Sequence, residues 1–299
     1  MNGEFTSPPA LWRHADSGQQ GYSKVAVEGP LLAFPALPCN PPSQRAPKGS
    51  QLAILSYSKR FIFIHIPKCG GSSIETEWAR LMPGDLVLRF DDAEALNQRY
   101  GVSMHSRLDQ FKDSRRLGSI EQFETCALVR TPLKVVESFY KYGLRQLNSA
   151  AKSGMINVTN KAWSLDEWKQ FVRDKLAAGD SANAPMFVNR IGEGAVREAM
   201  LSSSFDDYLE RVGDKRWERY MRDYTQKDGK DIAVNTVLKL EEPIAIRKYF
   251  KVRYFSAFTL QHVNTSGSHE RLVWSKPMRQ RYNEITEGEH KAFGYAITE

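Results

Sequence analysis

The sequence predicts an α/β fold with a parallel sheet, because two buried-strand patterns are each followed by a turn and a helix pattern. Residues 60–66 (RFIFIHI) and 123–130 (FETCALVR) are apolar runs typical of strands covered on both faces. Pro67 ends the first run and Thr131-Pro132 the second, since proline cannot extend a central strand. Apolar residues at helical spacing follow both turns. We therefore expect two strand-turn-helix units in one sheet.

The first turn has the composition of an anion-binding site. Gly70 and Gly71 allow the backbone to turn tightly and to approach a ligand closely. Ser72 and Ser73 are candidate N-caps of a helix that we expect to run through Leu81. Such a helix start directs free N–H groups and the positive end of the helix dipole at one point. Phosphate is the usual occupant of that position.

The lysine of this turn precedes the glycines, unlike the lysine of a Walker A loop, GxxxxGK[ST]. The segment IHIPKCGGSS (64–73) resembles the IPKTGGTS loop of sulfotransferases that use 3′-phosphoadenosine 5′-phosphosulfate (PAPS). The similar branch is that of carbohydrate sulfotransferases such as the heparan 2-O-sulfotransferases. The resemblance implies a P-loop-like three-layer sandwich with helical insertions. It also implies that the 5′-phosphate of PAPS is held by Lys68, Cys69, Gly70, Gly71, Ser72 and Ser73. The alternative is an ordinary strand-turn-helix corner with a solvated lysine.

The second unit resembles another element of the same family. RTPLKVVES (130–138) is similar to the RDPxxRxxS element that binds the 3′-phosphate of PAPS, and Arg130 and Ser138 are the positions that carry over. We expect Arg130 at the carboxyl edge of a parallel strand, where open α/β sheets bind ligands. A guanidinium binds phosphate through two parallel hydrogen bonds. Thr131 stands where the family usually has aspartate, and Val135 where a second arginine is common. Lys134 would have to take over part of the role of that arginine. Taken alone, Arg130 is better interpreted as a strand-end charge facing solvent, and its order and separation from the first motif favour the phosphate site instead.

Three C-terminal segments resemble the family more weakly. QHVNTS (261–266) is similar to an HxNxS segment that closes over the cofactor, which makes Asn264 and Ser266 candidate cofactor contacts. HKAFGY (290–295) is similar to the terminal helix of the family, and VLKLEEP (237–243) predicts a late strand followed by acidic residues. The QHVNTS segment can equally be a plain polar loop, because Asn, Thr and Ser are common in loops.

The resemblance implies transfer of a sulfuryl group from PAPS to an acceptor hydroxyl. Lys68 is the candidate for stabilising the bridging oxygen as charge develops there. His105 is the candidate base, since imidazole titrates near neutral pH and the 2-O-sulfotransferase branch uses a histidine in this region. Glu75 and Glu77 are rival bases that cannot face the same way, and a solvated helix face is their ordinary interpretation. His65 is expected to be a core histidine bonded to backbone. No metal is expected, because metal-ligand spacings are lacking.

Composition divides the 299 residues into a tail and one domain. Residues 1–50 are dense in proline and predict a flexible tail, whereas 51–299 form the predicted sulfotransferase domain. The apolar stretch of the tail is too short and too rich in proline to span a membrane, and a Golgi-type anchor is lacking. Cys39, Cys69 and Cys126 are an odd set that favours a reducing compartment, so we expect a cytoplasmic enzyme. Cys69 is expected to have a lowered thiol pKa beside the helix start.

The net charge of +7 indicates anionic partners. The cofactor accounts for part of it, and the acceptor, a glycan or a small-molecule alcohol, can itself be anionic. Signatures of zinc knuckles, RNP1 and helix-turn-helix motifs are lacking, so nucleic acid is not an expected partner. Residues 163–222 predict helices, with a capping box at Ser164 and Glu167, and such insertions build the acceptor cleft in the family.

The sequence therefore predicts a PAPS-dependent sulfotransferase acting on a carbohydrate hydroxyl, with two rivals. A P-loop kinase would need ATP and Mg²⁺, and this chain lacks the lysine after the glycines. A non-catalytic nucleotide-binding scaffold would keep the site without turnover. Replacing Lys68 separates the scaffold from an enzyme, because only the enzyme has turnover to lose.

Overall fold

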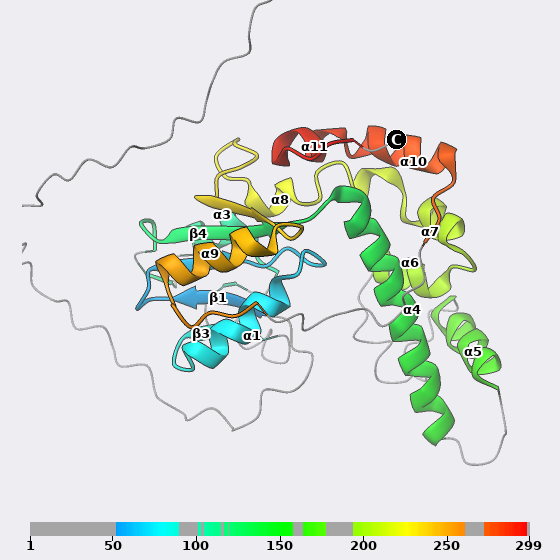
Figure 1. Ribbon diagram of the computed structural model, residues 1–299. Coiled ribbons are helices and arrows are strands. Elements are labelled where there is room, and N and C mark those ends of the chain that lie inside the picture. The colour runs from blue at the N-terminus through cyan, green and yellow to red at the C-terminus, as the bar shows by residue number, and fades with distance from the viewer. Residues whose placement is uncertain are drawn as a thin grey trace, which may run out of the picture. The chain divides into compact units, whose positions relative to one another are not determined.

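Five strands form one mixed sheet in the described part of the chain, with helices packed beside it (Figure 1). The computed structural model describes residues 52–89, 101–102, 105–114, 117–118, 120–157, 164–177, 194–260 and 272–297. The predicted tail, residues 1–50, lies outside them. The strands are β1 (Leu52–Ser56), β2 (Phe61–Ile64), β3 (Leu86–Arg89), β4 (Glu124–Val129) and β5 (Thr236–Lys239). Their order in the sheet is β3-β1-β2-β4-β5.

The predicted parallel sheet is correct for β2, β4 and β5. Phe63 pairs with Cys126, and Ala127 pairs with Val237, both in parallel register. The prediction is wrong for β1, which runs antiparallel to both β2 and β3. Only a short turn joins β1 to β2, and a connection of that length allows antiparallel pairing alone. Arg60, at the end of this turn, adopts a positive φ of 49°.

Both faces of β2 are buried, as the apolar run predicts. Phe61 stacks on Trp78 of helix α1 (Gly71–Leu81), with the ring centroids 4.8 Å apart. Phe250 of α9 (Pro243–Arg253) contacts both of these rings edge-on. The intervening residue Ile62 points to the opposite face because side chains alternate along a strand, and it too is fully buried.

A long helix follows β4 and leads into a helical region (Figure 1). The predicted helix after Pro132 is present and extends well beyond Tyr142, as α4 (Pro132–Asn157). It packs against α5 (Leu165–Ala177) and α6 (Ala195–Leu201). Gly143 allows the close crossing with α6, because a Cβ there would lie 2.4 Å from the Cβ of Ala199. The predicted capping box at the start of α5 is confirmed, since the Ser164 amide donates to Glu167 and the Glu167 amide to Ser164 Oγ.

Of the remaining described helices, one lies between β3 and β4 in the sequence and the others follow α6. They are α3 (Leu108–Asp113), α7 (Phe205–Val212), the 3₁₀ helix η4 (Asp214–Arg216), α8 (Arg222–Thr225), α10 (Lys276–Ile285) and α11 (Glu287–Phe293). The predicted terminal helix is therefore present, and Gly294 ends it in the left-handed conformation. Among the described helices, none has the length and apolar character needed to cross a lipid bilayer.

Candidate functional site

The glycine turn joins the carboxyl end of β2 to α1, as predicted, but a glycine rather than a serine occupies the N-cap. Gly70 is the N-cap, with φ 87°, and no side chain caps the helix. The Ser73 amide donates to the Gly70 carbonyl, 3.2 Å away. Ser72 and Ser73 therefore lie inside the first turn, and the prediction that they cap the helix is wrong. The amides of Gly71 and Ser72 open the helix, where backbone N–H groups lack an intrahelical acceptor.

Each glycine is required by what it touches. A Cβ on Gly70 would lie 2.6 Å from Leu240 Cδ1, and its positive φ would strain any other residue. A Cβ on Gly71 would lie 2.7 Å from Nδ1 of His65. Gly71 is thus explained by the imidazole beneath it, as well as by any ligand above it.

The side chain of Cys69 points into the core, away from the ligand side of the turn. Its side chain is fully buried, and its amide donates to the Ile66 carbonyl, 3.2 Å away. Burial raises the pKa of the thiol, so the prediction of a lowered pKa is wrong. Neither the thiol nor the amide of Cys69 faces a ligand above the turn.

Lys68 is held over the face of an aromatic ring. Its backbone has a positive φ of 68°, and its Nζ lies 3.1 Å from the ring centroid of Tyr142 on α4. Partial desolvation, followed by the positive charges of Arg145 and Arg130, lowers the pKa of Lys68 to about 7. The ammonium therefore loses its proton near neutral pH unless an anion binds beside it.

Arg130 lies against the turn, as the order of the two motifs predicts. Its Nη1 donates to the backbone carbonyl of Lys68, 3.3 Å away. Ser138 lies further along α4, half-buried and without a hydrogen bond to another described residue. Val135 is buried in the core, so this position could not present an arginine to the site. Lys134 is not the expected replacement, because its Nζ is paired with Glu137 at 3.0 Å.

The C-terminal segment closes onto the edge of the sheet beside Arg130. Glu241, just after β5, accepts hydrogen bonds from the amide and hydroxyl of Thr131, both at 2.9 Å. The other oxygen of Glu241 accepts from the Tyr295 hydroxyl at 2.9 Å. Thr131 thus joins the second motif to the C-terminal FGY segment. Asn264 and Ser266 lie outside the described residues.

His105 is close to the turn through an unexpected neighbour, His65. The two imidazoles contact each other, with ring centroids 5.3 Å apart. Nδ1 of the buried His65 is hydrogen-bonded to the carboxylate of Glu75, so the expected bond to backbone is wrong for this ring nitrogen. Desolvation lowers the pKa of both imidazoles to about 3, with Lys68 contributing in each case, so both are neutral at pH 7.

The two candidate glutamates are both buried, so their interpretation as a solvated helix face is wrong. They point apart, as their spacing predicts. Glu75 contacts His65, whereas Glu77 accepts hydrogen bonds from Arg80 and Thr259. These bonds, that of Arg80 first, hold the pKa of Glu77 well below its usual value. Glu77 is committed to structure, and only Glu75 contacts the candidate base region.

Two residues of the site were not predicted: Tyr142 and Arg145. Both lie on α4, and both follow Ser138 at helical spacing, so the three share one face of the helix. Arg145 is exposed and near enough to Lys68 to depress its pKa. The spacing i, i+4, i+7 from Ser138 is the sequence signal that could have found them.

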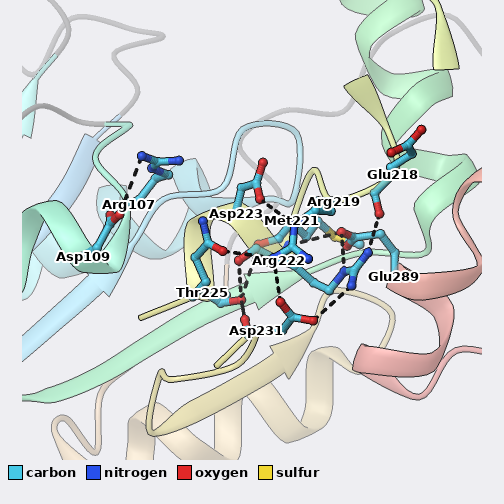
Figure 2. A network of polar contacts seen from close by, with 11 residues as sticks. Arg107, Asp109, Glu218, Arg219, Met221, Arg222, Asp223, Thr225, Asp231 and Glu289 are labelled. Carbon is cyan, nitrogen blue, oxygen red and sulfur yellow. Dashed lines mark hydrogen bonds and ion pairs between the residues drawn. The ribbon is translucent and has the colours of Figure 1, made fainter. Parts of the chain in front are cut away.

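A polar network surrounds Arg219 and Arg222, close in sequence to a residue that contacts the turn (Figure 2). The Tyr220 hydroxyl donates to the Pro67 carbonyl at 3.3 Å. Close to Tyr220 in sequence, Arg222 binds Glu289 of α11, Asp231 and the Glu218 carbonyl. This network fastens α8 to α11 and so holds Tyr220 against the turn.

Comparison of the chain with protein-family models, with curated proteins and with solved structures found no match. Within the residues that the structure describes, no group of three or more His, Cys, Asp or Glu side chains has a geometry that could hold a metal ion. The site is therefore defined by its own chemistry: helix amides, three basic side chains and a pair of histidines.

Proposed function

We propose that this protein is a PAPS-dependent sulfotransferase that transfers a sulfuryl group to an acceptor hydroxyl, with a carbohydrate as the acceptor. One observation supports it most: Arg130 contacts the backbone of Lys68, and neither residue nor Arg145 is paired with a carboxylate of the described residues. Three cations beside a helix start form a place for a polyanion. The mixed α/β sheet is compatible with the proposed P-loop-like three-layer sandwich.

Each part of the proposed cofactor has a partner. We assign the 5′-phosphate to the amides of Gly71 and Ser72, which open α1, and the 3′-phosphate to Arg130. We assign to Lys68 the stabilisation of the bridging oxygen, which gains negative charge when the S–O bond to the nucleotide breaks. Binding of the polyanion raises the pKa of Lys68, so the lysine is charged when it acts.

His105 is the proposed base. Its ring makes a hydrogen bond to the His65 backbone, and its buried Nδ1 has no partner among the described residues. A neutral imidazole with a vacant nitrogen can accept the proton of a hydroxyl. Desolvation, followed by His65 and then Lys68, lowers the pKa of His105. The negative charge of bound PAPS would offset the contribution of Lys68 and so increase the basicity of His105.

The acceptor and the compartment are also parts of this proposal. A hydroxyl on a glycan or small-molecule alcohol suits the base. The buried, unpaired thiols of Cys69 and Cys126 support a reducing compartment such as the cytoplasm.

Calorimetric titration with the product nucleotide, 3′-phosphoadenosine 5′-phosphate (PAP), tests the proposal. We expect PAP to bind without magnesium and more tightly than ATP or adenosine 5′-phosphosulfate. Arg130→Ala should weaken PAP roughly 10- to 150-fold, the equivalent of one charge-assisted contact. Arg247→Ala is the matched control, because Arg247 is exposed on α9.

Different outcomes identify the rivals. A folded protein that binds ATP with magnesium in preference to PAP would be a kinase-like protein, and the sulfotransferase proposal would be wrong. A protein that binds PAP but never consumes PAPS across a panel of hydroxyl acceptors would be a scaffold.

A further inference from the structure

We propose that Glu75 and His65 form a fixed pair that positions His105 and selects which of its ring nitrogens accepts the proton. This inference rests on the proposed function, because it takes His105 as the base. Glu75 and His65 are positioning residues, since neither is placed to touch the acceptor. The pair also connects the base to the phosphate-binding turn through Gly71.

The His65 ring is held on two sides. His65 directly follows β2, and Glu75 lies in the second turn of α1, so the pair joins the strand to the helix across the glycine turn. Nδ1 of His65 is hydrogen-bonded to Glu75, and both side chains are buried. In this inference Glu75 is the carboxylate that accepts, which assigns the proton of the pair to Nδ1 of His65. Above the ring, Gly71 lies so close that even a methyl group would overlap it.

His105 is in turn held by His65. Its ring packs on the His65 ring at an interplanar angle of 60°. Desolvation lowers the pKa of His105, and a hydrogen bond to the His65 backbone opposes this, as a ring N–H that donates to a carbonyl would. The buried Nδ1 is the nitrogen without a described partner, so the proton lies on Nε2 and the lone pair on Nδ1. The titratable groups that act on His105 among the described residues are His65 and Lys68.

The chemistry follows from this arrangement. The acceptor oxygen forms a bond to sulfur as the S–O bond to the nucleotide breaks, and the departing nucleotide takes that electron pair. Nδ1 of His105 is buried in the free protein, so the groups over it must move aside when the acceptor binds. The hydroxyl proton then passes to Nδ1, and the ring becomes an imidazolium. Neutral His65 separates this charge from the Glu75 carboxylate, which stabilises it through the ring. A carboxylate that orients an imidazole contributes in this way in catalytic triads.

The first experiment needs no substitution and no substrate. ¹⁵N NMR of the histidine rings in the wild-type protein at pH 7 should show His65 protonated on Nδ1. His105 should be protonated on Nε2, with a bare Nδ1. A His105 ring protonated on Nδ1, or one that exchanges between both forms, would overturn the inference.

Glu75→Gln then tests the pair, with Glu77→Gln as its matched control. The two glutamates are buried on the same helix, but Glu77 binds Arg80 and Thr259 instead of a histidine. We expect Glu75→Gln to mix the tautomers of His65 and His105 and to lower kcat about tenfold to a hundredfold. Its PAP affinity should stay within about twofold of wild type, because Glu75 lies beneath the turn. Glu77→Gln should leave both tautomers unchanged.

The outcomes separate this inference from the proposed function. If Glu75→Gln and Glu77→Gln have the same tautomers and the same pH profile of kcat, Glu75 is only structural and the inference is wrong. If PAP does not bind the wild-type protein, the proposed function fails, while the NMR result still decides whether the pair fixes His105. Gly71→Ala tests the connection to the turn. Its methyl group would overlap the His65 ring, so it should shift the ring signals of His65 and, through that ring, of His105.

Discussion

Two groups of basic side chains differ in what neutralises them. Arg219 and Arg222 are surrounded by acids: both bind Asp231, Arg219 also binds Asp223, and Arg222 also binds Glu289 (Figure 2). Lys68, Arg130 and Arg145 lie together around the glycine turn, and none is paired with a carboxylate in the described ranges. Desolvation, followed by repulsion from Arg145 and Arg130, lowers the pKa of Lys68. The first group is neutralised by carboxylates within the fold, whereas the second has no carboxylate partner among the described residues, as the proposed anionic ligand requires.

The two groups therefore make opposite predictions on substitution. Removing a cation from the network leaves a carboxylate unpaired and lowers stability. Removing a cation from the turn relieves repulsion and should cost function instead. Tyr220 connects the groups, because it touches the turn and lies next to the network in sequence.

The largest effect is expected for Arg222→Ala. Glu289, which it binds, is 1% exposed, and desolvation raises the pKa of this carboxyl to about 7 in spite of Arg222. Without the arginine, the free energy of unfolding should fall by about 3 kcal/mol at pH 8, where Glu289 is ionised in the wild type. At pH 6 Glu289 is already protonated, so the loss should be smaller. Urea denaturation at the two pH values measures both quantities.

Arg222→Lys is the control, because it keeps the charge and part of the hydrogen bonding. Equal losses for Arg222→Ala at pH 6 and pH 8 would show that the charge of Glu289 does not matter, and the contrast between the two groups would lose its electrostatic basis.

Lys68→Ala should have the opposite phenotype. We expect turnover to fall about 10²- to 10³-fold, the usual cost of removing one group that stabilises developing charge. The free energy of unfolding should be unchanged or slightly higher, because Arg130 and Arg145 lose a like-charged neighbour. Lys248→Ala, on the exposed face of α9, is the matched control for the loss of a lysine. A large loss of stability with unchanged turnover would show that Lys68 has a structural role and not a catalytic one.

The pKa of Lys68 predicts a proton that is taken up with the nucleotide. In the free protein Lys68 titrates at about 7, so at pH 8 most of it is neutral. PAP favours the charged form, so binding at pH 8 should take up roughly 0.9 proton, and affinity should fall about tenfold per unit above pH 7. Calorimetry at pH 8 in buffers of different ionisation enthalpy measures the uptake. His65 and His105 have pKa values too low to contribute there, and Lys68→Ala should abolish the uptake.

The parts of the fold that were predictable are those encoded over short stretches. β2 and the second half of β4 are apolar runs with a proline just beyond, so both strands were predicted, although each is shorter than the predicted run. The antiparallel pairing of β1 was not predicted, because residues 57–60 (YSKR) contain no glycine, proline or asparagine to mark a turn. Arg60 supplies the positive φ instead, at some conformational cost.

The site was predictable as a set of motifs but not as a set of contacts. Gly70, Lys68 and Arg130 were found because the conformation of a strand-helix turn is local. Burial is not local: the raised pKa of Cys69 and the low pKa of His105 depend on elements distant in sequence. The bond between His65 and Glu75 is missed for the same reason, since it requires the docking of α1 on the end of β2.

The smallest effect is expected for Arg219→Ala, which tests whether pairing alone makes a charge structural. Arg219 binds Asp231 at 2.6 Å and Asp223 at 3.3 Å, yet 45% of its side chain is exposed. Solvent screens exposed ion pairs, so the loss of stability should be under about 1 kcal/mol and should vanish in 1 M salt. Urea denaturation at low and high salt, with Arg222→Ala alongside, measures the difference. If both variants lost equal stability at high salt, burial would not distinguish them. The ion pair of Arg222 with the buried Glu289 of α11, which Arg219 lacks, would then add no stability of its own.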